Sequence, residues 1–234
     1  WDKFQKEDQI MVFKQYHGDQ NYLAAAIKYD SRRYFEDYKT SVDWYNGNRP
    51  NAFNITPYDR TIVLDADYVV ASNWLWNAIG SDMDFWCYRE AYDITINRRL
   101  DGSSTFGEHK YPMCWATVMI FNKSNRNQYL FDHMQMIRDN WQHYRDLYKI
   151  QRPTYRNDIA LSIALSLVDG GPTITPNLGR MASVMPEDKI TQLSLDTYSV
   201  EFLRDGSPKF FNIYGQDFHA MGKQQLGEIV AASF

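Results

Sequence analysis

Two aspartates separated by one residue follow an apolar run in the stretch PYDRTIVLDADYVV, at Asp65 and Asp67. Aspartate is disfavoured in strands and an unpaired buried charge is costly, so two carboxylates at the end of a predicted core strand need an explanation. Carboxylates at positions i and i+2 of a turn can face one divalent cation and leave coordination sites open for phosphate oxygens. The alternative is that one aspartate caps a turn and the other is solvated, and the isolated D-x-D pattern is common enough to favour that alternative.

Strands and helices are predicted to alternate around these aspartates. Apolar periodicity and turn residues predict strands at 10–13, 62–64, 84–90, 115–124, 172–175 and 209–215, and helices after residue 20, at 72–80, 127–148 and 157–169, and after residue 222. NGNRPN reads as a loop, and the polar stretch 93–112 reads as a lid or binding loop. This order predicts an α/β fold with a mixed, mostly parallel sheet flanked by helices, in which Asp65 ends a central strand.

Length and composition limit the classes of protein to be considered. The chain has 234 residues, which suits a single domain, and its formal net charge is −4 with no basic block, which speaks against binding nucleic acid through phosphates. No apolar run is long enough to cross a bilayer, and no signal segment opens the sequence. Cys87 and Cys114 lie in apolar surroundings and are expected to be buried, reduced thiols. We therefore expect a cytoplasmic protein without a membrane segment, in the host cytoplasm if the source is viral.

The segment TPYDRTIVLDADYVV resembles the metal-binding segment of GT-A-fold glycosyltransferases, and the best match is to the retaining, glycogenin-like family. The resemblance implies a Rossmann-like GT-A domain over residues 1–234 in which Asp65 and Asp67 bind Mn²⁺, or Mg²⁺. In that family the metal grips the diphosphate of a UDP-sugar, so a nucleotide-sugar donor is the implied partner.

A second segment, DFHAMGKQQL, resembles the C-terminal H-x-x-G…K motif of the same family. The resemblance implies that His219 is the third metal ligand and that Gly222 and Lys223 face the diphosphate. Imidazole suits transition metals, glycine lets backbone approach phosphate, and lysine supplies a compact positive charge. The sequence departs from the motif because Lys223 follows Gly222 directly and no Pro-Trp pair comes after it.

Two further positions correspond to donor-facing residues in the family. YRNDIALSIAL begins a helix with Asn157 and Asp158, where the family carries a polar D-Q-x-x-L-N opening aimed at the reacting sugar. The purely structural interpretation, an N-terminal cap with a favourable helix dipole, is nearly as strong. Arg89 ends the strand at 84–90 where relatives contact the donor, although a salt-bridged surface arginine is the favoured interpretation. The family's Asn-Ala-Gly segment is replaced here by residues 114–117, so the donor sugar is not implied.

The resulting hypothesis is a retaining glycosyltransferase that moves a sugar from a nucleoside diphosphate sugar to a hydroxyl group. The sequence before Asp65 has room for one strand–helix unit fewer than this fold needs. Either part of the nucleotide-binding region is missing, or the nucleotide base is held differently. A degenerate, non-catalytic glycosyltransferase fold that binds a sugar nucleotide or a glycan is the alternative, and a metal-dependent hydrolase or nucleotidyltransferase is a third. The segments TPYDRTIVLDAD and RNDIALSIAL are also similar to segments of glycosyltransferase-like proteins of large tailed phages. A glycan, a protein or a modified DNA base is therefore left open as the acceptor.

Overall fold

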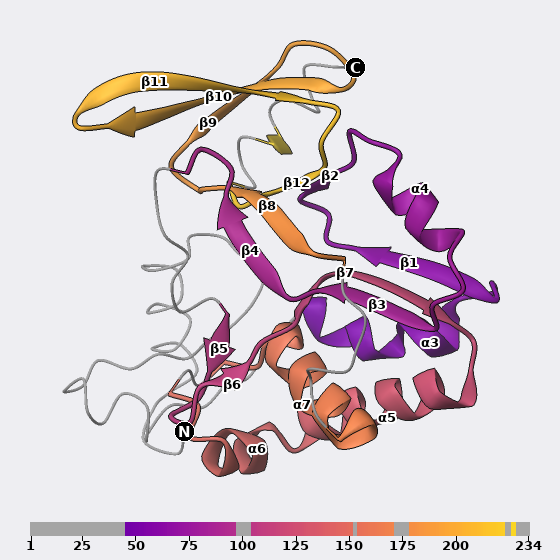
Figure 1. Cartoon of the computed structure of the whole chain (residues 1–234). Helices are drawn as coiled ribbons and strands as arrows, with labels where there is room; N and C mark the ends of the chain where they lie inside the picture. The colour runs from indigo at the N-terminus through magenta and orange to yellow at the C-terminus, as the bar shows by residue number, and fades with distance from the viewer. Residues whose placement is uncertain (1–44, 97–103, 152–153, 171–177, 223–225, 228–234) are drawn as a thin grey trace.

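The structure is a computed structural model that describes residues 45–96, 104–151, 154–170, 178–222 and 226–227. These residues form a mixed α/β structure (Figure 1). The helices are η1 (Tyr45–Asn51), α3 (Ala52–Ile55), α4 (Trp74–Ile79), α5 (Asn125–Asp139), α6 (Trp141–Leu147) and α7 (Asn157–Asp169). The predicted strands at 10–13 and 172–175, the helix after residue 20 and most of the predicted last helix lie outside the described residues.

The strands form two three-stranded sheets, one four-stranded sheet and one two-stranded hairpin within the described residues. The strands are β1 (Arg60–Leu64), β2 (Tyr68–Val69), β3 (Phe85–Tyr88), β4 (Glu90–Asp93), β5 (Thr105–Phe106), β6 (Tyr111–Pro112), β7 (Trp115–Asn122), β8 (Arg180–Val184), β9 (Lys189–Gln192), β10 (Thr197–Arg204), β11 (Ser207–Tyr214) and β12 (Phe218–Ala220). Strands were therefore predicted correctly at β1, β3, β7 and β11.

The first three-stranded sheet has the order β1-β7-β3, and β7 runs antiparallel to both neighbours. As predicted from its continuous apolar character, β7 is buried along all but its last residue. Helices α5 and α7 pack against each other and lie below this sheet in Figure 1. Phe121 of β7, Leu130 of α5 and Leu161 of α7 each have 0% of their surface exposed and belong to one core.

The four-stranded sheet has the order β2-β12-β8-β4 and joins segments that are distant in sequence. Strand β12 pairs in parallel with β8 and antiparallel with β2, so the chain returns late to the turn that carries the two aspartates. A second core, which includes Val184, Val200 and Phe218, lies between this sheet and the antiparallel sheet β9-β10-β11. That sheet forms the upper edge of the molecule in Figure 1.

The expected mostly parallel sheet is wrong for the described strands. Only the pairs β4–β8 and β8–β12 are parallel there, and β1 is an edge strand rather than a central one. The continuous apolar sequence of β7 indicates that both of its faces are buried. It does not indicate whether the neighbouring strands run parallel or antiparallel to it. A Rossmann-like arrangement therefore cannot be inferred from burial alone.

The helices follow the predicted pattern with one interruption. The helix expected at 127–148 is divided into α5 and α6 at Asn140, whose side-chain amide donates to the Met136 carbonyl at 2.9 Å. Asparagine competes in this way for backbone groups and weakens a helix interior. Helix α7 begins at Asn157 as predicted and ends at Gly170, whose φ of 72° suits glycine.

Two other expectations concern short elements. The helix predicted at 72–80 is α4, which is shorter and begins at Trp74 with Asn73 in the N-cap position. The Ser72 hydroxyl accepts a hydrogen bond from Trp74 N–H at 3.1 Å. Part of the stretch predicted as a loop, 93–112, is a hairpin of β5 and β6. Among the described helices, none combines the length and the apolar character that crossing a membrane requires.

Candidate metal centre

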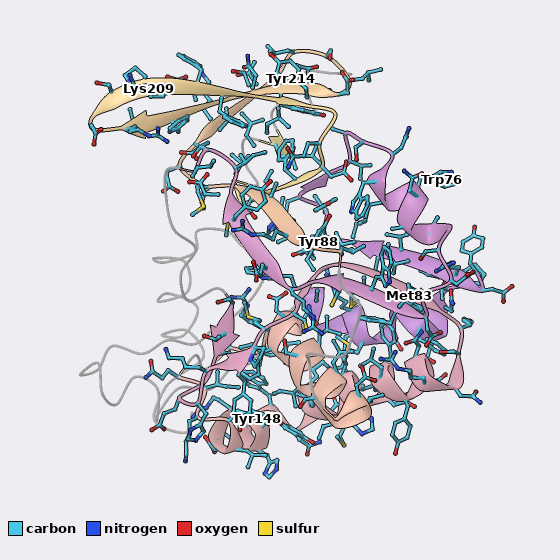
Figure 2. All side chains as sticks on the ribbon, in the orientation of Figure 1. Trp76, Met83, Tyr88, Tyr148, Lys209 and Tyr214 are labelled. Atoms are coloured by element: carbon cyan, nitrogen blue, oxygen red, sulfur yellow. The ribbon has the colours of Figure 1, made fainter. Side chains whose placement is uncertain are left out.

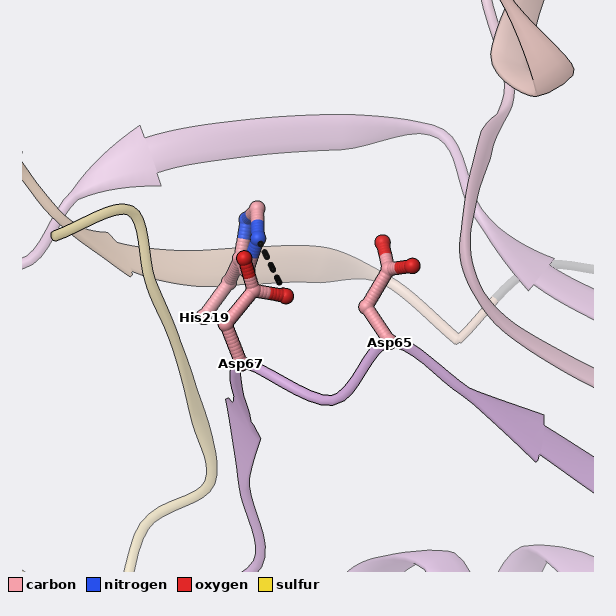
Figure 3. A group of neighbouring side chains, drawn as sticks. All are labelled: Asp65, Asp67 and His219. Carbon is pink, nitrogen blue, oxygen red and sulfur yellow. Dashed lines mark ion pairs between the residues drawn. The ribbon is translucent and has the colours of Figure 1, made fainter. Parts of the chain in front are cut away.

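Asp65 and Asp67 lie in a tight turn between β1 and β2. Asp65 follows the last residue of β1, as predicted, and its N–H donates to the Thr117 carbonyl of β7 at 2.9 Å. The turn closes with a hydrogen bond from Tyr68 N–H to the Asp65 carbonyl at 3.0 Å. The turn is therefore held by one hydrogen bond within it and one to β7, and both carboxylates emerge from it on the same side (Figure 3).

His219 reaches this turn from β12. It pairs with Tyr68 of β2 on one side and with Ser183 of β8 on the other. The next residue, Ala220, donates its N–H to the Asp67 carbonyl at 2.8 Å, and this bond fixes the register of β12 relative to the turn. Strand pairing alone therefore places the imidazole beside the two carboxylates, as Figure 3 shows.

The three side chains have the geometry of a metal site. One potential ligand atom from each of Asp65, Asp67 and His219 lies within 4.8 Å of the others. Nε2 of His219 is 3.3 Å from Oδ1 of Asp67, and neighbouring ligands of an octahedral ion with bonds of about 2.1 Å are roughly 3 Å apart. Two carboxylates and one imidazole are a donor set that Mn²⁺ or another transition metal accepts. The three residues therefore fit a divalent metal ion, and they are the ligand set that the sequence resemblance implied, with His219 as the third ligand.

The sequence did not reveal that Arg49 also belongs to this site. Its guanidinium donates to Oδ1 of Asp65 and to the Ala116 carbonyl, and only 6% of its side chain is exposed. Arg49 lies in the NGNRPN stretch that had been interpreted as a loop and that forms η1. No sequence signal identifies it, because its contacts depend on a side chain that crosses from η1 to β7.

Burial and charge act against each other at Asp65. Burial raises the pKa of Asp65 above its ordinary value, and the positive charge of Arg49 opposes this increase. The nearby Asp67 carboxylate raises the pKa of Asp65 further. Asp67 and His219 are 5% and 9% exposed, so the cluster is an enclosed group of charges that a cation would stabilise.

Asp158 and Asn157 have structural contacts at the start of α7. Oδ1 of Asp158 accepts a hydrogen bond from Ala116 N–H at 2.8 Å, and Oδ2 accepts one from the Arg156 guanidinium at 2.5 Å. Oδ1 of Asn157 accepts a hydrogen bond from the Tyr155 hydroxyl at 3.1 Å. The predicted helix cap at these two residues is wrong, because Arg156 occupies the N-cap position and makes no side-chain cap hydrogen bond. Asp158 does lie in the first turn, where a negative charge suits the helix dipole. Contact of either residue with a substrate stays a prediction.

The start of α7 is connected to the metal cluster through one residue of β7, Ala116. Ala116 donates its N–H to Asp158, and its carbonyl accepts a hydrogen bond from Arg49. The same guanidinium donates to Asp65. The remaining predicted residues are less closely involved. Gly222 packs against the backbone of Pro186, where an added Cβ would lie 3.2 Å from the carbonyl oxygen. Lys223 lies outside the described residues.

Arg89 lies between β3 and β4 and is partly buried. It is close enough to Cys87 and Cys114 for its charge to favour both thiolates. The hydrogen bond to Cys114, and then burial, nevertheless raise the pKa of Cys87 well above its ordinary value. Both cysteines are free and buried, as predicted. The donor-facing role of Arg89 stays a prediction.

Comparison with known proteins adds no family to this geometry. The chain matches no protein-family model, no curated protein and no solved structure at a significant level.

Proposed function

We propose that the chain is a metal-dependent, retaining glycosyltransferase of the GT-A type that uses a nucleoside diphosphate sugar, UDP-linked, as donor. One observation carries this proposal. The motif resemblance required His219 to meet Asp65 and Asp67, and these three side chains do converge although they are distant in sequence. Neither composition nor hydrophobic periodicity demands that convergence.

The residues suggest a division of roles. Asp67, His219 and one oxygen of Asp65 would hold Mn²⁺ or Mg²⁺, and the ion would neutralise the charge of the departing diphosphate. Arg49 donates a hydrogen bond to Oδ1 of Asp65 and keeps that carboxylate oriented when no nucleotide sugar is bound. Asp158 keeps Ala116 and Arg156 in place, so we propose that it orients the site and does not attack the sugar. The free thiols Cys87 and Cys114 suit a reducing, cytoplasmic setting.

The alternative, a glycosyltransferase fold that binds a sugar nucleotide or glycan without turnover, is favoured by one observation. Both oxygens of Asp158 are engaged by protein groups, so this carboxylate is not available as a catalytic group without rearrangement. Donor binding without hydrolysis or transfer is the expected behaviour of such a protein.

One experiment separates these functions. The full chain is incubated with Mn²⁺ and a panel of nucleotide sugars, and binding is measured by calorimetry while slow donor hydrolysis is followed by chromatography. We expect Mn²⁺-dependent binding and hydrolysis of a UDP-sugar, and loss of both in the variant Asp65→Asn/Asp67→Asn. The exposed Asp82→Asn serves as the matched control. Binding without hydrolysis supports the alternative, and absence of metal-dependent binding across the panel contradicts both.

A further inference from the structure

A second concave site lies between the β5–β6 hairpin, the residues after α6 and the start of α7. It is a pocket of about 410 Å³, within the usual range for small-molecule sites. None of the three side chains of the metal cluster lines it. The elements that surround it are at the lower left of the molecule in Figure 1.

The floor of this pocket is apolar and well packed. It is made of five side chains that are each less than 9% exposed, namely Phe106, Met113, Trp115, Ile150 and Ile159. The indole Nε1 of Trp115 is buried and has no hydrogen-bond partner among the described residues. A buried donor without an acceptor costs free energy, and such groups call for an explanation beyond packing.

The rim of the pocket carries mostly positive charge. Lys110, Lys149 and Arg156 line it against a single carboxylate, that of Glu108. Lys110 and Lys149 are exposed, and neither forms an ion pair with another residue in the described part of the chain. The Arg156 guanidinium is fixed by Asp158 and lies 5.9 Å from the centre of the Trp115 ring. Cationic hydrogen-bond donors thus stand above an aromatic and aliphatic floor.

The backbone at the rim is held in an unusual conformation. Lys110 and Lys149 have φ values of 56° and 53°, in the left-handed region that side chains other than glycine rarely adopt. Gly107 is also left-handed, and a Cβ at this position would collide with the Tyr148 carbonyl. Such strained positions persist only where surrounding contacts enforce them, and they gather at ligand sites. The two lysines are therefore held in place by docking of the hairpin against the end of α6.

We propose that this pocket binds a small molecule that combines a ring or other apolar face with a phosphate or carboxylate group. The apolar face would lie on the floor around Trp115, and the anionic oxygens would meet Lys110 and Lys149. The pocket is connected to the metal cluster through Asp158, which accepts hydrogen bonds from the Arg156 guanidinium and from Ala116 N–H. The carbonyl of the same Ala116 accepts a hydrogen bond from Arg49. That the ligand is the acceptor of sugar transfer rests on the proposed function, whereas the binding site itself does not.

The test uses the full chain without metal or nucleotide sugar, so that its failure is distinguishable from failure of the proposed function. Calorimetry at low ionic strength compares phenyl phosphate and benzoate with inorganic phosphate and phenol. We expect phenyl phosphate or benzoate to bind at least about tenfold more tightly than inorganic phosphate or phenol, because only they engage both floor and rim. The stronger of the two identifies the preferred anionic group.

Two double variants and one assigned signal locate the binding. Lys110→Asn/Lys149→Asn removes both charges while asparagine tolerates the left-handed backbone, and we expect about tenfold weaker binding. Lys189→Asn/Lys209→Asn changes two exposed lysines at the opposite end of the molecule, where Figure 2 labels Lys209, and should leave binding unchanged. The indole N–H resonance of Trp115, assigned by its loss in Trp115→Phe, should shift on binding. Equal affinity in both double variants, no shift of this resonance, or no binding of either ring-bearing anion would overturn the proposal.

Discussion

At the scale of single residues, the balance of charge around Asp65 decides how the site behaves. The carboxylate lies between the positive charge of Arg49 and the negative charge of Asp67, and burial amplifies both effects. Arg49 supplies a positive charge to the cluster and also satisfies the Ala116 carbonyl. A metal ion bound here would therefore act together with a resident guanidinium, and the two cations partly compete for Asp65.

Removing that guanidinium should have opposite effects on folding and on metal binding. Arg49→Gln is expected to lower the free energy of unfolding by about 2–4 kcal/mol without metal, because a buried ion pair loses one partner. The same change should strengthen Mn²⁺ binding several-fold, since the ion no longer shares Asp65 with a positive side chain. Chemical denaturation and calorimetry measure the two quantities, and weaker Mn²⁺ binding in the variant would show that Arg49 is needed to hold Asp65 in position.

At the scale of elements, short strands position both sites. Strand β12 has three residues, yet its pairing with β2 and β8 brings His219 to the metal cluster. The β5–β6 hairpin has strands of only two residues each. It is anchored by Tyr111 and Tyr148, whose rings are 4.8 Å apart in an edge-to-face arrangement. Elements of this length have little intrinsic stability, so their positions depend on such specific contacts.

Two glycine substitutions separate the docking of the hairpin from backbone strain. Gly107→Ala places a Cβ against the Tyr148 carbonyl at a φ of 69°, whereas Gly206→Ala has a φ of 73° and no atom within 4 Å. We expect about 1 kcal/mol of destabilisation for Gly206→Ala and roughly 2–4 kcal/mol for Gly107→Ala, because only the second adds a steric conflict. Equal losses in denaturant titrations would mean that the hairpin does not depend on this close approach.

At the scale of the whole molecule, the candidate metal site joins two distant parts of the chain. The turn between β1 and β2 supplies both carboxylates, and β12 supplies the imidazole. A metal that binds only the assembled site stabilises the native arrangement by mass action. Separation of β12 from the turn must then release the ion, so the opening of this region becomes less frequent.

Hydrogen exchange should report this coupling directly. With Mn²⁺ present, we expect slower exchange of the Ala220 and Met221 amides, which donate to the Asp67 and Val184 carbonyls. Amides at the outer end of the β10–β11 hairpin, near Arg204 and Ser207, serve as the internal control and should not change. Uniform slowing across both regions would indicate general stabilisation, and no slowing at β12 would contradict a metal bridge to His219.

How far the sequence predicts this molecule depends on how local each feature is. The strand before Asp65 and the helix beginning at Asn157 were predicted because turn residues and apolar periodicity lie next to each other in the chain. The meeting of His219 with the aspartates followed from a motif resemblance. The strand directions and the role of Arg49 could not be predicted, because pairing partners and side-chain reach are set by tertiary structure.

The most direct test of the central claim is the anomalous X-ray scattering of Mn²⁺ in crystals of the full chain. The account predicts one strong peak with ligand distances of roughly 2.0–2.6 Å to Asp65, Asp67 and Nε2 of His219. A data set from the variant His219→Ala, grown under the same conditions, should show a weaker peak or none. Strong anomalous density elsewhere, with none at this cluster, would contradict the metal site and with it the proposed transferase.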